Sequence, residues 1–295
     1  MSEQPYRYMS SDEDSSRWVG FPFRAGDVVI STRSKSGTTW MQMICLMLAH
    51  GAPDLPAPLA ELSPWMDQLV APKEDVHALL AAQRHRRIIK THTPLDGVPL
   101  DSRATYVVVA RHPLDMAVSL YHQGSNINRE RLRELSGAPE PAPPARAQLG
   151  AREWLLSWLA SEVDPREELD SLPGVMWHLS DAWVRREQPN VVLVHYQDLV
   201  SDLAGQMRRI AGRLGFSVPD EVWPGLVQAA TFEHMRGRAE YLLPNRDGVL
   251  KDANAFFRRG RSGGGLELLS EAEIVAYTAR AQTLAPPDLL AWLHR

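Results

Sequence analysis

The chain has 295 residues, 44% of them hydrophobic, which is enough to bury a sizeable core in one large domain or two smaller ones. Its formal net charge of −4 lacks the basic excess typical of proteins that bind nucleic acid or membrane surfaces. No apolar run approaches the ~18 to 20 residues of a spanning helix, and no secretory signal is visible. With Cys45 as the single cysteine, an internal disulfide framework is impossible. We therefore expect a cytoplasmic protein without a membrane span or a nucleic-acid partner.

Short runs of β-branched residues between turn residues predict four buried strands. In chain order they are Asp27 to Thr32, Arg87 to Lys90, Thr105 to Ala110 and Val191 to His195. Helical patterns follow or separate them, at Thr38 to His50, Pro113 to His122, Arg152 to Ala160, His178 to Arg186 and Leu199 to Leu214. This alternation predicts an α/β fold of three layers, P-loop-like, with a central parallel sheet flanked by helices. We expect residues 1–295 to form a single domain.

The segment from Ser136 to Gly150 is rich in proline and glycine, so it is not expected to form regular structure. We expect a mobile insertion within the domain. Long loops in compact domains are often functional, so a lid over a substrate pocket and a plain surface loop are both open alternatives.

A loop suited to anion binding follows the first predicted strand, VVIST, and precedes a helix. In this layout the turn and the helix N-terminus direct free NH groups and the positive end of the helix dipole at an anion. Gly37 allows close approach of the backbone. Hydroxyl donors come from Ser36, Thr38 and Thr39, and Lys35 adds a full positive charge.

The order of residues in this loop differs from that of a nucleoside-triphosphate loop. The latter reads GxxxxGK[ST], with its lysine after the second glycine, whereas Lys35 precedes Gly37 here. A P-loop kinase or nucleotidase stays open as an alternative function. The sequence has no HExxH pair, cysteine cluster or acidic run near the loop, so no metal is expected.

Three segments resemble the cytosolic sulfotransferases that use 3′-phosphoadenosine 5′-phosphosulfate (PAPS). KSGTTW, at Lys35 to Trp40, resembles the family's 5′-phosphosulfate loop. The segment of Lys90, Thr91 and His92 resembles KTHLP, whose histidine is the catalytic base of the family. ARHPLDMAVSLYH resembles the 3′-phosphate segment, in which an arginine and a serine stand eight residues apart, as Arg111 and Ser119 do.

Three later segments continue the resemblance. VHYQDLVSD resembles FYEDM with Tyr196 at its tyrosine, and TFEHM resembles SFExM with Phe232 at the aromatic position near adenine. FFRRG, at Phe256 to Gly260, resembles the segment that closes on the 3′-phosphate. The resemblance extends from residue 21 to about residue 265.

The resemblance implies a sulfotransferase that moves a sulfuryl group from PAPS to a hydroxyl of a small acceptor and releases adenosine 3′,5′-bisphosphate. His92 would be the general base, Lys35 and Lys90 would stabilise the leaving group, and Ser119 would take part in catalysis. The implied donor site comprises Lys35, Ser36, Gly37, Thr38, Thr39, Trp40, Arg111, Ser119, Tyr196, Phe232, Phe257, Arg258, Arg259 and Gly260. Lysine is scarce in this arginine-rich chain, with four residues in all, and two of the four stand at these catalytic positions.

The acceptor is expected to be hydrophobic: phenolic, steroid-like or lipid-like. Seven aromatic residues are candidates to line its pocket, namely Phe21, Phe23, Trp65, Tyr121, Trp154, Trp158 and Trp177. A carbohydrate or amine acceptor is the second alternative. A bisphosphate-binding protein without activity is a third hypothesis, which the presence of both lysines and of His92 disfavours.

The sequence departs from the family pattern in three places. Arg33 and Ser34 stand where Tyr-Pro usually precedes the loop lysine, which adds a charge beside the donor. GGGLE follows the RRG segment in place of GDWK. The short dimer segment KxxxTVxxxE is absent, so the sequence leaves the oligomeric state open.

Overall fold

The computed structural model describes residues 4–137, 139, 149–243, 247–260 and 262–295. Four parallel strands form one sheet in the order β2-β1-β3-β4. They are β1 (Val28–Ser31), β2 (Ile88–Thr91), β3 (Thr105–Ala110) and β4 (Val191–His195). The register pairs Val28 of β1 with Ile88 and Thr105 of its two neighbours.

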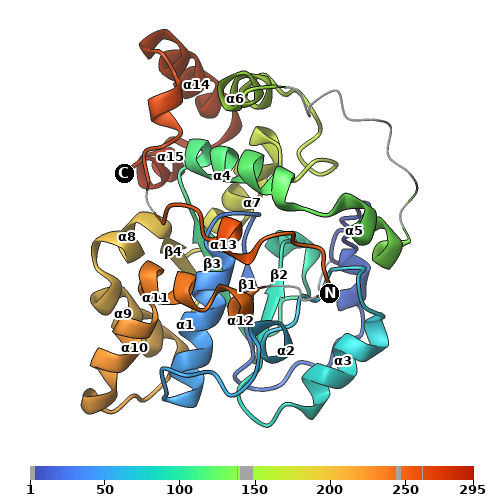
Figure 1. Ribbon diagram of the computed structural model, residues 1–295, viewed down its shortest axis with the longest axis vertical. Helices are drawn as coiled ribbons and strands as arrows, with labels where there is room; N and C mark the ends of the chain where they lie inside the picture. Colours follow the sequence, from blue (N-terminus) through green and yellow to red (C-terminus); the bar gives the residue numbers. More distant parts are fainter. Residues whose placement is uncertain (1–3, 138, 140–148, 244–246, 261) are drawn as a thin grey trace.

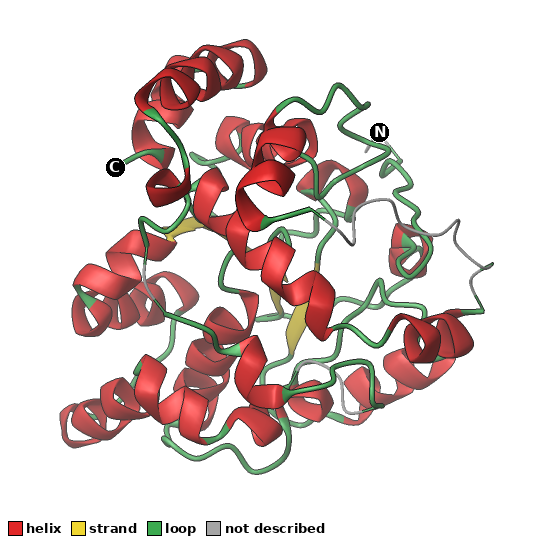
Figure 2. Cartoon of the chain, turned by 45° about the horizontal axis from the view of Figure 1, so that its top comes forward, coloured by secondary structure: helices red, strands yellow, loops and turns green. Residues whose placement is uncertain are grey.

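Side chains alternate between the two faces of the sheet, as the pleat of a strand requires. In β3, Val107 and Val109 face one apolar cluster, while Tyr106 and Val108 face the other. Both faces are covered, which explains why the strands read as unbroken apolar runs in the sequence. Figure 2 shows the strands inside the molecule with helices on either side.

The first apolar cluster is covered by helices from the first part and the middle of the chain. They are α1 (Thr38–His50), α2 (Leu59–Leu62), α8 (Tyr196–Ser201), α9 (Leu203–Leu214), α10 (Trp223–Ala229), α11 (Phe232–Gly237), α12 (Ala239–Leu242) and α13 (Ala253–Phe256). Helix α1 packs directly against the sheet and is buried from Thr38 to Leu48, so its almost uniformly apolar sequence reflects burial on all sides.

The second apolar cluster is covered by α3 (Lys73–Ala82), α4 (Pro113–Asn126), α6 (Ala151–Leu159), α7 (Leu172–Val184), α14 (Glu271–Leu284) and α15 (Pro287–Leu293). The two helical layers and the sheet between them confirm the predicted three-layer fold (Figure 1). Helix α5 (Arg129–Ser136) has no buried residue and continues from α4. The Pro-rich insertion predicted after it lies mostly outside the described residues.

One helix that was predicted as continuous is two helices in the structure. The pattern from Leu199 to Leu214 belongs to two helices, α8 and α9, that meet at Asp202. The backbone of Asp202 is extended, with φ −145°, and its carboxylate accepts a hydrogen bond from Gly205 N as the N-cap of α9. The Asp202 cap therefore breaks the helix, although the helical spacing of apolar residues continues past it. Helix α7 also starts earlier than predicted, at Leu172, behind the Ser171 N-cap.

Because the strands are parallel, their carboxyl ends meet at one edge of the sheet. The loop after β1 leads into α1, and β2 leads into His92 and Thr93. At the same edge β3 is followed by Arg111, and β4 by Tyr196. Ligands of open α/β sheets bind at such an edge.

Candidate active site

A cavity of about 430 Å³ opens at the carboxyl edge of the sheet. It is lined by nearly every residue that the sequence predicted for the site: Lys35, Gly37, Thr38, Thr39, Trp40, Lys90, His92, Arg111, Ser119, Tyr196, Phe232, Phe257, Arg258, Arg259 and Gly260. The exception is Ser36, which is buried but is not among the lining residues. Segments as distant in sequence as residues 35 and 260 therefore share one cavity.

The loop before α1 has the strained backbone of an anion cradle. Lys35 has a φ of 64°, the only positive φ among the described non-glycine residues, and Gly37 has a φ of 108°. A Cβ on Gly37 would lie 3.0 Å from the Tyr196 ring, so glycine fits here for both its conformation and its size. Gly37 provides no side-chain cap, and the NH groups of the first turn of α1 have no acceptor within the helix.

Lys35 extends along one wall of the cavity. Its Nζ donates to Gln123 Oε1 at 3.2 Å and lies 4.1 Å from the centroid of the Phe256 ring. Burial, helped by Arg111 and Arg258, lowers the pKa of Lys35 to about 7. The ammonium thus lacks a carboxylate partner among the described residues, and an anion in the cavity would stabilise it.

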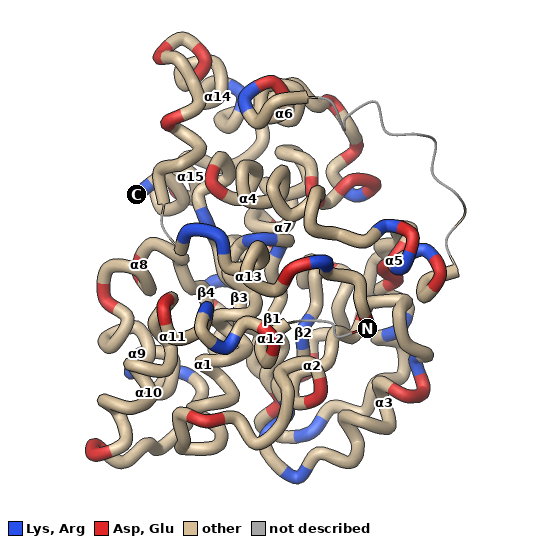
Figure 3. The backbone as a smooth tube through the Cα atoms, in the orientation of Figure 1, with Lys and Arg blue, Asp and Glu red and all other residues tan. Residues whose placement is uncertain are grey.

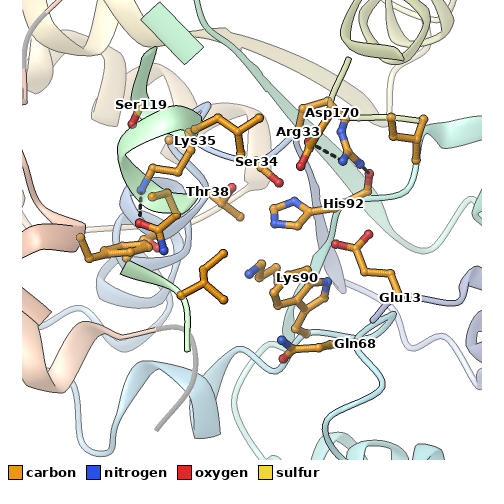
Figure 4. Close-up of a pocket in the computed structure, with 18 of the residues that line it drawn as sticks. Glu13, Arg33, Ser34, Lys35, Thr38, Gln68, Lys90, His92, Ser119 and Asp170 are labelled. Atoms are coloured by element: carbon orange, nitrogen blue, oxygen red, sulfur yellow. Dashed lines mark hydrogen bonds and ion pairs between the residues drawn. The ribbon is translucent and has the colours of Figure 1, made fainter. Parts of the chain in front are cut away.

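Lys90 lies across the cavity from Lys35 and is almost fully buried (Figure 4). Its Nζ stands 3.3 Å from the centroid of the Trp65 ring, a cation–π contact. Burial lowers its pKa to about 7, against the opposing effect of Glu13 and Asp67. The cavity therefore holds two desolvated ammonium groups.

His92 is fixed in one tautomer by the backbone. Its Nδ1 lies 2.5 Å from the carbonyl oxygen of Thr32, and because a carbonyl only accepts, Nδ1 carries the hydrogen. Nε2 is left as the basic nitrogen. Burial, with Lys90 and Arg33 nearby, holds the pKa of His92 well below 6.5, so the ring is neutral at pH 7. The Trp65 ring packs edge-on against the imidazole at a centroid distance of 4.5 Å.

The backbone of His92 is held from both sides. Arg33 Nη1 donates to the His92 carbonyl oxygen, and Nη2 donates to Asp170 Oδ1 at 2.6 Å. Asp67, fully buried, accepts from His92 N at 3.0 Å and from the Thr91 hydroxyl. Arg33 was noted in the sequence only as a departure from the family pattern, and the structure shows that it binds the histidine segment.

Arg111, Tyr196 and Trp40 form another wall of the cavity. Arg111 Nη1 donates to the Lys35 carbonyl oxygen at 3.2 Å, and its guanidinium lies 4.4 Å from the Tyr196 ring centroid. Trp40 packs edge-on against Tyr196 at 5.3 Å and donates from Nε1 to Ala230 O. Ser119 lies on α4 near Lys35 (Figure 4).

The segment after α13 closes the cavity. A Cβ on Gly260 would lie 2.3 Å from the Phe232 ring, so only glycine fits this contact. Phe257 is buried in the core beside Phe232, while Arg258 and Arg259 line the cavity, and Figure 3 shows these basic positions directly after α13.

The GGGLE sequence that follows has contacts of its own. Asp115, in the first turn of α4, accepts hydrogen bonds from Gly263 N at 2.9 Å and from Gly265 N at 3.0 Å. A Cβ on Gly265 would lie 2.5 Å from the backbone of Leu114. The departure from GDWK is therefore accommodated by direct packing of the glycines on α4.

Of the seven aromatic residues proposed for the acceptor pocket, Trp65 lines the cavity and the others lie elsewhere. Phe21 and Phe23 belong to the second apolar cluster, as do Trp154 and Trp158. Tyr121 packs on Trp154, and Trp177 donates a hydrogen bond to Tyr8. Aromatic character alone did not separate pocket residues from core residues.

Several lining residues were not predicted from the sequence, and the polar ones among them include Glu13, Gln68 and Gln123. Gln123 could have been predicted as a lining residue, because it stands one helical turn after Ser119 on the same face of α4. Glu13 and Gln68 come from segments without periodic structure, and no sequence signal marks them.

The described part of the chain lacks two further kinds of feature. It contains no group of three or more His, Cys, Asp or Glu side chains arranged to hold a metal ion. It also contains no helix with the length and apolar character needed to span a membrane.

Comparison with known proteins identifies the family. Residues 25–274 match the model of the sulfotransferase domain. A glycolipid sulfotransferase of Mycobacterium tuberculosis is 44% identical over 97% of this chain and 93% of its own length, and human sulfotransferase 2B1 is 28% identical over 81% of this chain and 60% of its own length.

Solved structures share the fold. Retinol dehydratase in complex with androsterone and the inactive cofactor PAP matches with a TM-score of 0.70 at 20% identity, over 92% of this chain and 84% of its own. A mouse sulfotransferase complexed with PAP matches with a TM-score of 0.69 at 18% identity, over 95% and 92% of the two chains. The family match overturns the alternative of a kinase or nucleotidase. On the sequence match and the shared fold, this chain belongs to the sulfotransferase family.

Proposed function

We propose that this enzyme transfers a sulfuryl group from PAPS to a hydroxyl of an amphiphilic small molecule. The observation that carries the proposal is the position of His92: its Nε2 is a free base in the same cavity as two buried lysines, neither of which forms a salt bridge with a described residue. A base and two cations at one site match a reaction in which a hydroxyl loses a proton and an anionic group leaves.

The cavity fits an anionic nucleotide. Lys35, Arg111 and Arg258 supply positive charge, and the close packing of Gly37 on Tyr196 and of Gly260 on Phe232 fixes two of the segments that line it. Two solved relatives of the same fold carry PAP, the bisphosphate product, in their complexes. We assign Trp40 and Phe232 to the adenine side, and Ser119, Arg111, Arg258 and Arg259 to the 3′-phosphate side, as the family resemblance implies.

In the proposed reaction PAPS supplies the sulfuryl group, and this chain supplies the proton acceptor and the charge. His92 Nε2 takes the proton of the acceptor hydroxyl while the hydroxyl oxygen bonds to sulfur. The bond from sulfur to the 5′-phosphate oxygen breaks, and that oxygen keeps the electron pair. Lys35 and Lys90 stabilise the resulting negative charge. The Thr32 carbonyl stabilises the positive charge of the imidazolium through Nδ1–H.

The lining of the cavity supports an acceptor with an apolar part. Apolar residues between α4 and α13 also line the cavity: Leu120, Ile127, Leu132, Val249, Leu250 and Phe256. The relatives that are 44% identical are named glycolipid sulfotransferases. Glycolipids are therefore the first acceptor class to test, ahead of phenols and sterols.

Donor binding and transfer test the function together. Adenosine 3′,5′-bisphosphate should raise the melting temperature of the enzyme, and ATP with magnesium should not. Arg111→Ala should weaken the bisphosphate shift, since this substitution removes a cation from the donor wall. Labelled PAPS should then label a hydroxyl acceptor. A melting-temperature rise with ATP and magnesium but none with the bisphosphate would contradict the proposal.

A further inference from the structure

Two polar side chains in the cavity have no role in the chemistry described above. Glu13 belongs to the N-terminal segment and Gln68 to the segment before α3, and an isolated antiparallel bridge pairs their backbones. Both side chains line the cavity that contains His92 and Lys90 (Figure 4). They face the proposed acceptor from the side opposite to the donor loop.

Neither side chain is satisfied by the protein. Gln68 is only 9% exposed, yet its amide makes no hydrogen bond with any residue that the structure describes. The Glu13 carboxyl likewise makes no hydrogen bond or ion pair within the described ranges. Glu13 is only partly buried, and neither its carboxyl nor the Gln68 amide is completely shut off from the cavity, so both can bind a ligand that completes their hydrogen bonds.

The chemistry of the pair selects for hydroxyl groups. Burial raises the pKa of Glu13 to about 8, so at pH 7 its carboxyl both donates and accepts, as does the amide of Gln68. A hydroxyl has the same double capacity. A cationic amine is disfavoured, because Lys90 and Arg33 interact electrostatically with Glu13 and bring positive charge to the same place.

Asp170 does not compete for this role. Its carboxylate is already bound by Arg33, at 2.6 Å. Trp65 Nε1 and Arg33 Nε also lack a hydrogen-bond partner among the described residues, but these two atoms are buried, whereas Glu13 and Gln68 stay available to a ligand in the cavity.

We propose that Glu13 and Gln68 form a subsite that binds a second hydroxyl of a polyol acceptor and so presents a neighbouring hydroxyl to His92. The inference rests on the proposed function and goes beyond it, since it makes this pair determine specificity for sugar headgroups over acceptors with one hydroxyl. The apolar residues would then hold the lipid part.

The test compares kcat/KM for an alkyl glucoside with that for 2-naphthol, which has one hydroxyl. Glu13→Leu and Gln68→Leu should each lower the ratio of the two values at least about tenfold, the effect of a lost buried hydrogen bond. Glu187→Leu is the matched control, because the Glu187 side chain is 90% exposed and does not line the cavity. The backbone bridge is retained in both test variants, and the bisphosphate melting-temperature shift checks their folding.

Monodeoxy glucosides test the subsite without any variant. In the wild type, one deoxy analogue that keeps the reacting hydroxyl should lose at least about tenfold in kcat/KM, and that loss should disappear in Glu13→Leu or Gln68→Leu. Equal turnover of all such analogues, or losses that persist in both variants, would overturn the subsite. So would a wild type that sulfates 2-naphthol and no glucoside, an outcome that leaves the proposed function intact. Failure to transfer from PAPS to any hydroxyl would instead defeat the proposed function.

Discussion

The Nδ1–H of His92 donates to the carbonyl oxygen of Thr32 at 2.5 Å, a bond from the end of β2 to the end of the neighbouring strand β1. It couples the orientation of the proposed base to the strand that leads into the proposed phosphate loop. Because the carbonyl cannot donate, the bond also decides that Nε2 is the nitrogen available to the acceptor.

His92→Ala should lower kcat by about 10²- to 10⁴-fold, the usual contribution of a general base. Affinity for adenosine 3′,5′-bisphosphate should stay near that of the wild type, because the donor loop and Arg111 are untouched. Steady-state kinetics and calorimetry measure the two quantities. Comparable activity of the variant and the wild type would remove the assignment of His92 as the base.

Arg33 should control the pH at which the enzyme loses activity in acid. In the proposed mechanism the neutral form of His92 is the active one, and its depressed pKa places the loss of kcat/KM well below pH 6.5. Arg33→Met removes a nearby cation and leaves Asp170 unpaired. Both changes raise the pKa of His92, so activity should begin to fall at a higher pH. The pH profile of Arg33→Lys, which retains the charge, is the control, and an unchanged profile in Arg33→Met would contradict this role.

Above neutral pH, the enzyme should take up protons when it binds the bisphosphate. In the free enzyme the pKa of Lys35 and that of Lys90 are each about 7, and a bound anion raises both. Above pH 7 the lysines must be protonated on binding, so bisphosphate affinity should fall by up to about tenfold per pH unit for each lysine.

Calorimetry at pH 8 in buffers of different ionisation enthalpy measures this proton uptake. Lys35→Met should reduce it, whereas Lys73→Met, a change at a partly exposed lysine outside the cavity that donates to Val19 O, should leave it unchanged. Binding without proton uptake at pH 8 would show that the lysines are already protonated in the free enzyme.

The buried pair of Asp27 and Arg87 should matter for stability. Both side chains are 2% exposed, and Arg87 donates to both carboxylate oxygens of Asp27, just before β1 and β2 begin. Asp27→Ala leaves the guanidinium buried without its counter-ion and should lower the free energy of unfolding by about 3–5 kcal/mol. Denaturant unfolding measures this loss. Arg103→Ala, which breaks the more exposed pair with Asp101, should have a much smaller effect. Equal losses would contradict the argument.

The sequence by itself determined the layers and the reaction class. Strand and helix periods are local, so β3, β4 and α1 were predicted with their observed ends. The parallel order of strands and helices brought the segments at Lys35, Lys90 and Arg111 to one edge, and the six ordered segments identified the family.

Tertiary structure alone decided which side chains complete the site. Arg33 meets Asp170 across 137 positions, and Tyr196 sets the space beside Gly37. Such contacts depend on how loops from separate strands pack, which no local period encodes. For the same reason the sequence could not choose Trp65 among seven aromatic candidates, or find Glu13. Glu13 became a candidate only because the fold places its carboxyl in the cavity near Lys90, where it makes no hydrogen bond with a described residue.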